Sequence, residues 1–148
     1  MGIESVSYRF EPAGTDLAEL TDWLRLHGAT SGDRQGTYVM AGPNHWIDLL
    51  VRADGPRAAT IQFRVAITNP IFVVAILDGL ISQLRGRFAG SVMDAAGRVL
   101  EDEDRLGVLH DDFSKGRSRF TEHYGDVLMP VSADEVFARL RAAFRHDD

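Results

Sequence analysis

Histidine and aspartate residues come together at one place in the chain where they could hold a metal ion or exchange protons. His110, Asp111 and Asp112 are consecutive, and His123 follows one short segment later. If folding brought His110 and Asp111 near His123, their imidazole and carboxylate groups could ligate a divalent ion. The alternative is a solvated helix face with ordinary surface histidines, because matches to such short motifs often have no function.

The rest of the sequence predicts no metal, cofactor or catalytic site. The chain has no cysteine, and no two of its histidines have the i, i+4 spacing of a helical zinc site. The glycine-rich segment 28–32 lacks the lysine of a phosphate-binding loop and follows a predicted helix instead of a strand. Segment 89–93 lacks the second glycine of the turn that exposes a nucleophilic serine. We therefore expect a non-catalytic protein with no metal and no cofactor.

A run of acidic residues is the most distinctive feature of the sequence. The segment 101–112 contains six acidic residues and a single arginine, which gives it a local charge of −5. Buried unpaired charges are too costly, so we expect the run to project into water as one negative surface, joined by its last two members if the segment is helical. It is either a docking patch for a basic protein or a solvated helix start. The residues are Glu101, Asp102, Glu103, Asp104, Asp111 and Asp112.

Aromatic residues around the Gly-Pro-Asn turn at 42–44 form a second candidate binding surface. Tyr38 precedes this turn and Trp46 follows it. Exposed tyrosine and tryptophan side chains are typical anchors of protein interfaces, so both residues are candidates for contact with a partner. The alternative is that Trp46 packs beneath a helix.

Charge and hydropathy exclude several kinds of partner. The chain has 22 acidic and 16 basic residues, a formal net charge of −6, which disfavours non-specific binding to nucleic acids or acidic membranes. The most apolar stretch, Ile71 to Leu77, is far shorter than the roughly 20 residues of a membrane-spanning helix. No basic, apolar signal segment opens the sequence. We therefore expect a cytoplasmic protein that binds neither nucleic acids nor membranes, while its oligomeric state stays open.

Strands and helices must position these candidate residues. Alternating polar and apolar residues predict strands over 5–11, 37–41, 45–53 and 60–67, and a shorter strand over 91–94. Apolar residues at helical spacing predict helices over 16–28, 70–88 and 132–144. The residues placed to begin these helices are Asp16 with Glu19, Asn69 with Pro70, and Ser132 with Glu135.

The segment 101–126 is the hardest to assign. Its apolar residues have roughly helical spacing, but Gly107 and Gly116 each weaken a helix by ~1 kcal/mol relative to alanine. With this segment as a possible helix, the element order is β-α-β-β-β-α-β-(α)-α. That order predicts one α+β domain over residues 1–148, a mostly antiparallel sheet with helices packed on one face.

This outline resembles the immunity proteins that are encoded beside bacterial polymorphic toxins. The resemblance covers the small, acidic, cysteine-free α+β build, the Asn69-Pro70 helix opening and the strand within 88–94. It implies a non-catalytic protein-binding module that neutralises a cognate toxin by direct binding, and a basic toxin would match the acidic charge of the chain. The alternatives are a small-ligand-binding protein or enzyme that uses a cleft between sheet and helices, with His110, Asp111 and His123 as its polar groups, and a homodimer that pairs through a strand edge.

Overall fold

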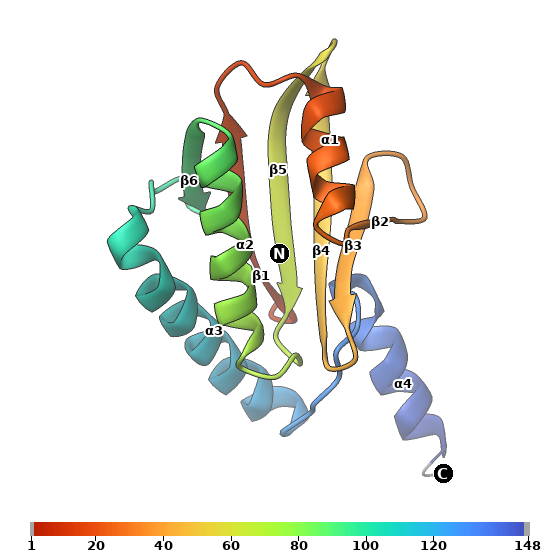
Figure 1. Ribbon diagram of the computed structural model, residues 1–148. Helices are drawn as coiled ribbons and strands as arrows, with labels where there is room; N and C mark the ends of the chain where they lie inside the picture. Colours follow the sequence, from red (N-terminus) through yellow and green to blue (C-terminus); the bar gives the residue numbers. More distant parts are fainter. Residues whose placement is uncertain (1, 147–148) are drawn as a thin grey trace.

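A six-stranded antiparallel sheet forms the centre of the molecule (Figure 1). The computed structural model describes residues 2–146. The strands follow the order β2-β3-β4-β5-β1-β6 across the sheet, and each neighbouring pair is antiparallel. The predicted α+β class is confirmed, and β2 lies in a segment for which the sequence predicted neither a strand nor a helix. The strands are β1 (Ser5–Pro12), β2 (Thr30–Ser31), β3 (Thr37–Gly42), β4 (His45–Asp54), β5 (Arg57–Ala66) and β6 (Gly90–Asp94).

Alternation along the strands gives the sheet one apolar face. Leu49 of β4 lies opposite Phe63 of β5, and both side chains are at most 2% exposed. Side chains one position away point to the other face, because successive residues of a strand alternate between faces. Asp48 and Arg64, which are paired in the register, lie on that other face and are only partly buried. The period of two in the sequence therefore separates a covered face from an open one.

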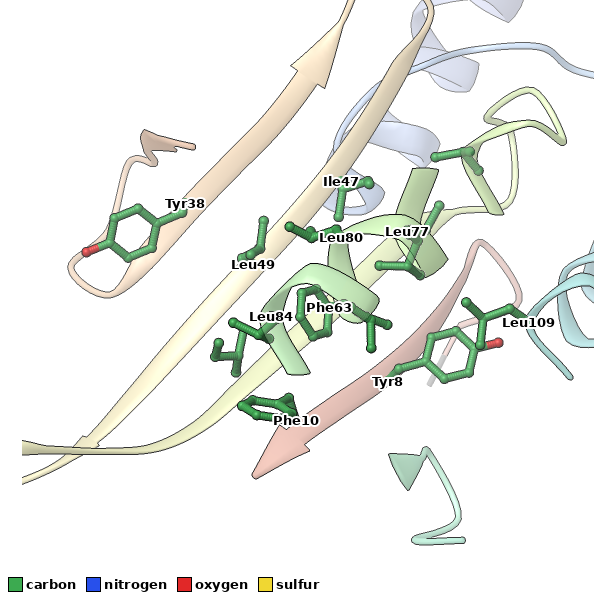
Figure 2. Packing of buried hydrophobic residues seen from close by; sticks show 14 of the residues in the cluster. Tyr8, Phe10, Tyr38, Ile47, Leu49, Phe63, Leu77, Leu80, Leu84 and Leu109 are labelled. Atoms are coloured by element: carbon green, nitrogen blue, oxygen red, sulfur yellow. The ribbon is translucent and has the colours of Figure 1, made fainter. Parts of the chain in front are cut away.

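Three helices cover the apolar face of the sheet. Leu77 and Leu84 of the middle helix belong to the same buried cluster as Phe10 and Phe63 of the sheet (Figure 2). The third helix runs beside the second, on the side of β1 and β6 (Figure 1). The helices are α1 (Leu17–Leu26), α2 (Val73–Arg87) and α3 (Asp102–Tyr124).

The C-terminal segment reaches the open face of the sheet. After α3, residues 125–131 lead to a short 3-10 turn, η1 (Ala133–Glu135), and to α4 (Val136–His146). Ser132 Oγ and Ala133 N each donate a hydrogen bond of 3.0 Å to Asp48 Oδ2 on the open face. The expectation that the helices pack on one face therefore holds for α1, α2 and α3. The C-terminal turn departs from it, because a carboxylate of the open face holds that turn.

The segment that was hard to assign is one continuous helix of 23 residues, α3. Gly107 lies on its exposed side. Gly116 faces the sheet, and a Cβ atom there would lie 2.8 Å from Ile67 Cδ1. The glycine that weakens the isolated helix therefore permits its close approach to the end of β5, and tertiary packing outweighs the lower helix propensity.

The two predicted capping boxes form only in part. Asp16 is the N-cap of α1 but makes no side-chain capping bond, and the carboxylate of Glu19 forms an ion pair with α2 instead. Ser132 accepts a hydrogen bond from Asp134 N, while the carboxylate of Glu135 at the end of η1 pairs with Arg139 of α4. Both residues at the cap position are therefore placed as expected, but the reciprocal carboxylate bonds are absent from the described residues.

The predicted N-cap role of Asn69 is wrong. The helix α2 begins at Val73. Asn69 lies four residues before this start and is 0% exposed. Its Oδ1 accepts a hydrogen bond of 2.8 Å from Trp46 N, and its Nδ2 donates one of 2.9 Å to Ala66 O. The side chain of Asn69 therefore satisfies backbone groups at the ends of β4 and β5, so it is not free to cap a helix.

Replacing Asn69 by alanine is expected to lower the free energy of unfolding by about 1–3 kcal/mol, the usual result of leaving a buried polar group unpaired. Urea denaturation measures this loss. The matched control is Asn44→Ala in the exposed turn before β4, which should change stability by less than ~0.5 kcal/mol. Equal losses in the two variants would show that the side-chain bonds of Asn69 contribute nothing.

Candidate functional site

The first four residues of the acidic run form the start of α3. Glu101 is the N-cap residue, and Asp102, Glu103 and Asp104 make up the first turn. All four residues are exposed, so the expected projection into water is confirmed for them. Their position is locally favourable because the N-terminus of a helix carries a partial positive charge.

Asp102 differs from its three neighbours because two arginines bind it. Its Oδ1 lies 2.7 Å from Arg105 Nη1 and 2.5 Å from Arg85 Nη1. The hydrogen bond from Arg105, followed by the charge of Arg85, holds the pKa of Asp102 below its usual value. Glu101, Glu103 and Asp104 form no ion pair with any side chain that the structure describes, and we call these three residues the acidic turn.

Arg105 is a buried structural residue that the sequence analysis missed. Its side chain is 1% exposed, although it stands in the most charged part of the chain. It donates to Asp78 Oδ1 at 2.7 Å and to Ser82 Oγ at 2.6 Å on α2, besides Asp102. The spacing of Arg105 could have predicted its burial. Arg105, Leu109 and Phe113 follow one another at intervals of four residues and therefore lie on the same, buried side of α3. Arg105 therefore fixes the acidic turn against α2.

Asp111 and Asp112 do not extend the acidic turn as a free negative surface. Asp111 pairs with Lys115 at 2.8 Å, and Asp112 accepts a hydrogen bond of 2.9 Å from the hydroxyl of Tyr8. Burial, followed by the charge of Asp112, raises the pKa of Tyr8 above its usual value, so this hydroxyl stays protonated and donates. Lys115 therefore neutralises the charge of Asp111, and the hydroxyl of Tyr8 binds the carboxylate of Asp112.

The hypothetical site of His110, Asp111 and His123 is not assembled. Both histidines lie on α3, and at 1.5 Å per residue they are about 20 Å apart along its axis. Among the side chains that the structure describes, which end at residue 143, no group of three histidine or acidic residues is placed to hold a metal ion. The sequence brings these residues near one another along the chain, but a straight helix keeps them apart.

Two apolar side chains stand beside the acidic turn. Leu106, one turn after Glu103 on α3, is 47% exposed. Val99 is 52% exposed, just before the helix, whereas Leu100 between Val99 and Glu101 is buried. The N-terminal end of α3 therefore presents three carboxylates together with two exposed apolar side chains.

The aromatic pair around the 42–44 turn is not one surface. Tyr38 is opposite Leu49 in the register, points to the helix-covered face and is only 8% exposed. Trp46 points to the open face, where its Nε1 donates a hydrogen bond of 3.0 Å to Asp48. The expectation that both are exposed anchors is wrong for Tyr38, because the strand alternation turns it into the core.

The interface between sheet and helices is filled with side chains where α2 and α3 meet the sheet. The cavity there, lined among others by Tyr8, Leu77 and Leu109, has a volume of about 10 Å³. That volume admits about one water molecule. A cleft of ligand size is therefore not present at this place.

Comparison with known proteins adds no relative. No protein-family model matches the chain, and no curated protein or solved structure matches it. Within residues 2–146, none of the helices combines the length and the apolar character that crossing a membrane requires. Function is therefore inferred from the surface itself.

Proposed function

We propose that this chain is a non-catalytic protein-binding module, an immunity protein that neutralises a cognate bacterial toxin by direct binding. The observation that carries the proposal is the acidic turn, Glu101, Glu103 and Asp104, beside exposed Leu106 and Val99. The contact surface thus has the two components of a specific interface, a charged rim and apolar anchors. The complementary partner is basic and has an apolar recess.

The charges of the acidic turn act mainly on the rate of association. Carboxylates without internal partners extend a negative field into water, which attracts a basic protein and orients it before contact. Arg105 and Arg85 hold the neighbouring Asp102, so the turn keeps its shape in the free protein. A preformed surface loses less conformational entropy on binding.

Neutralising the acidic turn tests the proposal. The variant Glu101→Gln, Glu103→Gln, Asp104→Asn should change the free energy of unfolding by less than ~1 kcal/mol, because exposed charges contribute little. It leaves Asp102 unchanged, since that residue is bound to Arg105. A toxin encoded beside this chain should associate with the variant at least tenfold more slowly, and its association with the original protein should slow steeply with salt.

The matched control changes the net charge by the same amount elsewhere. Asp16, Asp33 and Asp54 are exposed and form no ion pair among the described residues, so their neutralisation should leave the association rate within about twofold. Surface plasmon resonance measures both rates, and co-expression with the toxin measures rescue of growth. Equal rates for the two triple variants would contradict the role of the acidic turn, and a toxin that still kills co-expressing cells would contradict neutralisation.

A further inference from the structure

A groove of about 470 Å³ runs along the C-terminal half of α3, far from the acidic turn. Ile71, just before α2, forms its apolar side. The opposite side is a row of polar side chains from α3, namely Ser114, Arg117, Ser118, Thr121 and Glu122. The groove is wide open to solvent, so a ligand bound there would keep part of its surface in water.

A hydrogen bond to the backbone of a buried residue fixes the side chain of Arg117 at this groove. Its Nη1 donates a hydrogen bond of 2.7 Å to the backbone carbonyl of Asn69, which is itself fully buried. Only a quarter of the arginine side chain is exposed. A guanidinium that is anchored through one nitrogen loses little conformational freedom when its other donors bind an anion.

A carboxylate of the chain itself already occupies Arg117. Asp126 Oδ1 lies 3.3 Å from Arg117 Nη2, and the Asp126 side chain is 80% exposed. This is a long, exposed ion pair, the kind that contributes little to stability. An external carboxylate can therefore take the place of Asp126 without disturbing the fold.

We propose that this groove binds a small monocarboxylate, which displaces Asp126 from Arg117 and rests its apolar part against Ile71. Ser114, Ser118 and Thr121 make no side-chain hydrogen bond among the described residues, so their hydroxyls are available to the bound carboxylate. Glu122 disfavours a second negative charge in the groove, which is why the ligand carries only one. This site is separate from the proposed toxin-binding surface and does not depend on it.

Titration with butyrate, followed by proton–nitrogen NMR at constant ionic strength, tests the proposal. The amide signals of residues 114–122 should shift with saturation in the millimolar range, and sodium chloride at the same ionic strength should not cause these shifts. Succinate, with two charges, should bind at least threefold more weakly than butyrate. Shifts that increase linearly without saturation, or that chloride reproduces, would overturn the proposal.

Three variants assign the binding to Arg117. Asp126→Asn removes the internal competitor and should lower the Kd for butyrate about two- to fivefold, in keeping with the loss of an exposed ion pair. Arg117→Gln should raise the Kd at least tenfold, and Arg117→Lys, which keeps the charge without the planar fork, should raise it at least threefold. Arg119→Gln, an exposed arginine on the same helix, is the matched control and should leave the Kd within twofold.

The two arginine replacements also separate binding from folding. Their amide spectra show whether the helix is intact, and Arg117→Lys keeps the positive charge should Arg117→Gln unfold. An unchanged Kd in a folded Arg117 variant would refute the site. An unchanged Kd in Asp126→Asn would refute the displacement.

Discussion

Replacing Arg105 by alanine is expected to lower the free energy of unfolding by about 3–5 kcal/mol, the cost of breaking a buried ion pair by removing one partner. The guanidinium is 1% exposed and binds Asp78, Asp102 and Ser82. Without it, Asp78, whose side chain is only 21% exposed, loses its ion-pair partner in the narrow space between α2 and α3. Urea denaturation followed by circular dichroism measures the loss.

The control for Arg105 is an arginine of the same helix that lies in water. Arg119→Ala removes the same chemical group from an exposed position of α3 and should cost less than ~0.5 kcal/mol. The double replacement of Arg105 and Asp78 should be less damaging than the sum of the two single replacements, because it leaves no unpaired charge. A loss below ~1 kcal/mol for Arg105→Ala alone would mean that the buried bonds do not hold α3 against α2.

Replacing Leu77 by alanine is the second large effect, with an expected loss of about 2–5 kcal/mol. Leu77 is 2% exposed in the second turn of α2, and its side chain belongs to the cluster between helix and sheet (Figure 2). The loss combines the transfer of buried methyl groups to water with the cavity that they leave. Equilibrium unfolding in urea gives the free energy directly.

Leu26→Ala makes the same chemical change at an exposed site. Leu26 ends α1 and is 84% exposed, so its replacement should cost less than ~0.5 kcal/mol. A similar loss at both positions would indicate that helix propensity, and not burial, determines the effect at Leu77. A loss below ~0.5 kcal/mol at Leu77 would contradict the packing of α2 on the sheet.

The elements and the apolar face were accessible from the sequence because they follow from local periodicity. A period of two predicted the long strands, and apolar residues at helical spacing predicted all of α2, with a start three residues too early. The exposure of Glu101, Glu103 and Asp104 was also predictable, since three unpaired charges in one turn cannot be buried at an acceptable cost in free energy. These properties depend on residues that are neighbours in the chain.

The pairing of polar residues was decided only by the tertiary structure. Arg105 could become buried because α2 supplies Asp78 and Ser82, which lie more than twenty residues earlier in the chain. Asn69 satisfies backbone groups of two strands, although its sequence context is that of a helix cap. In each case a buried polar group must find partners, and its partners come from elements that no local pattern connects.

The arrangement of candidate site residues likewise depended on the whole fold. The sequence placed Tyr38 and Trp46 around one turn, but the strand register sends them to opposite faces of the sheet. It grouped His110 with His123, but the straight course of α3 separates them. Conversely, the groove at Arg117 arises because the start of α2 lies beside α3. Residue types and spacing thus determined which side chains are available, and the packing of distant segments decided which of them meet.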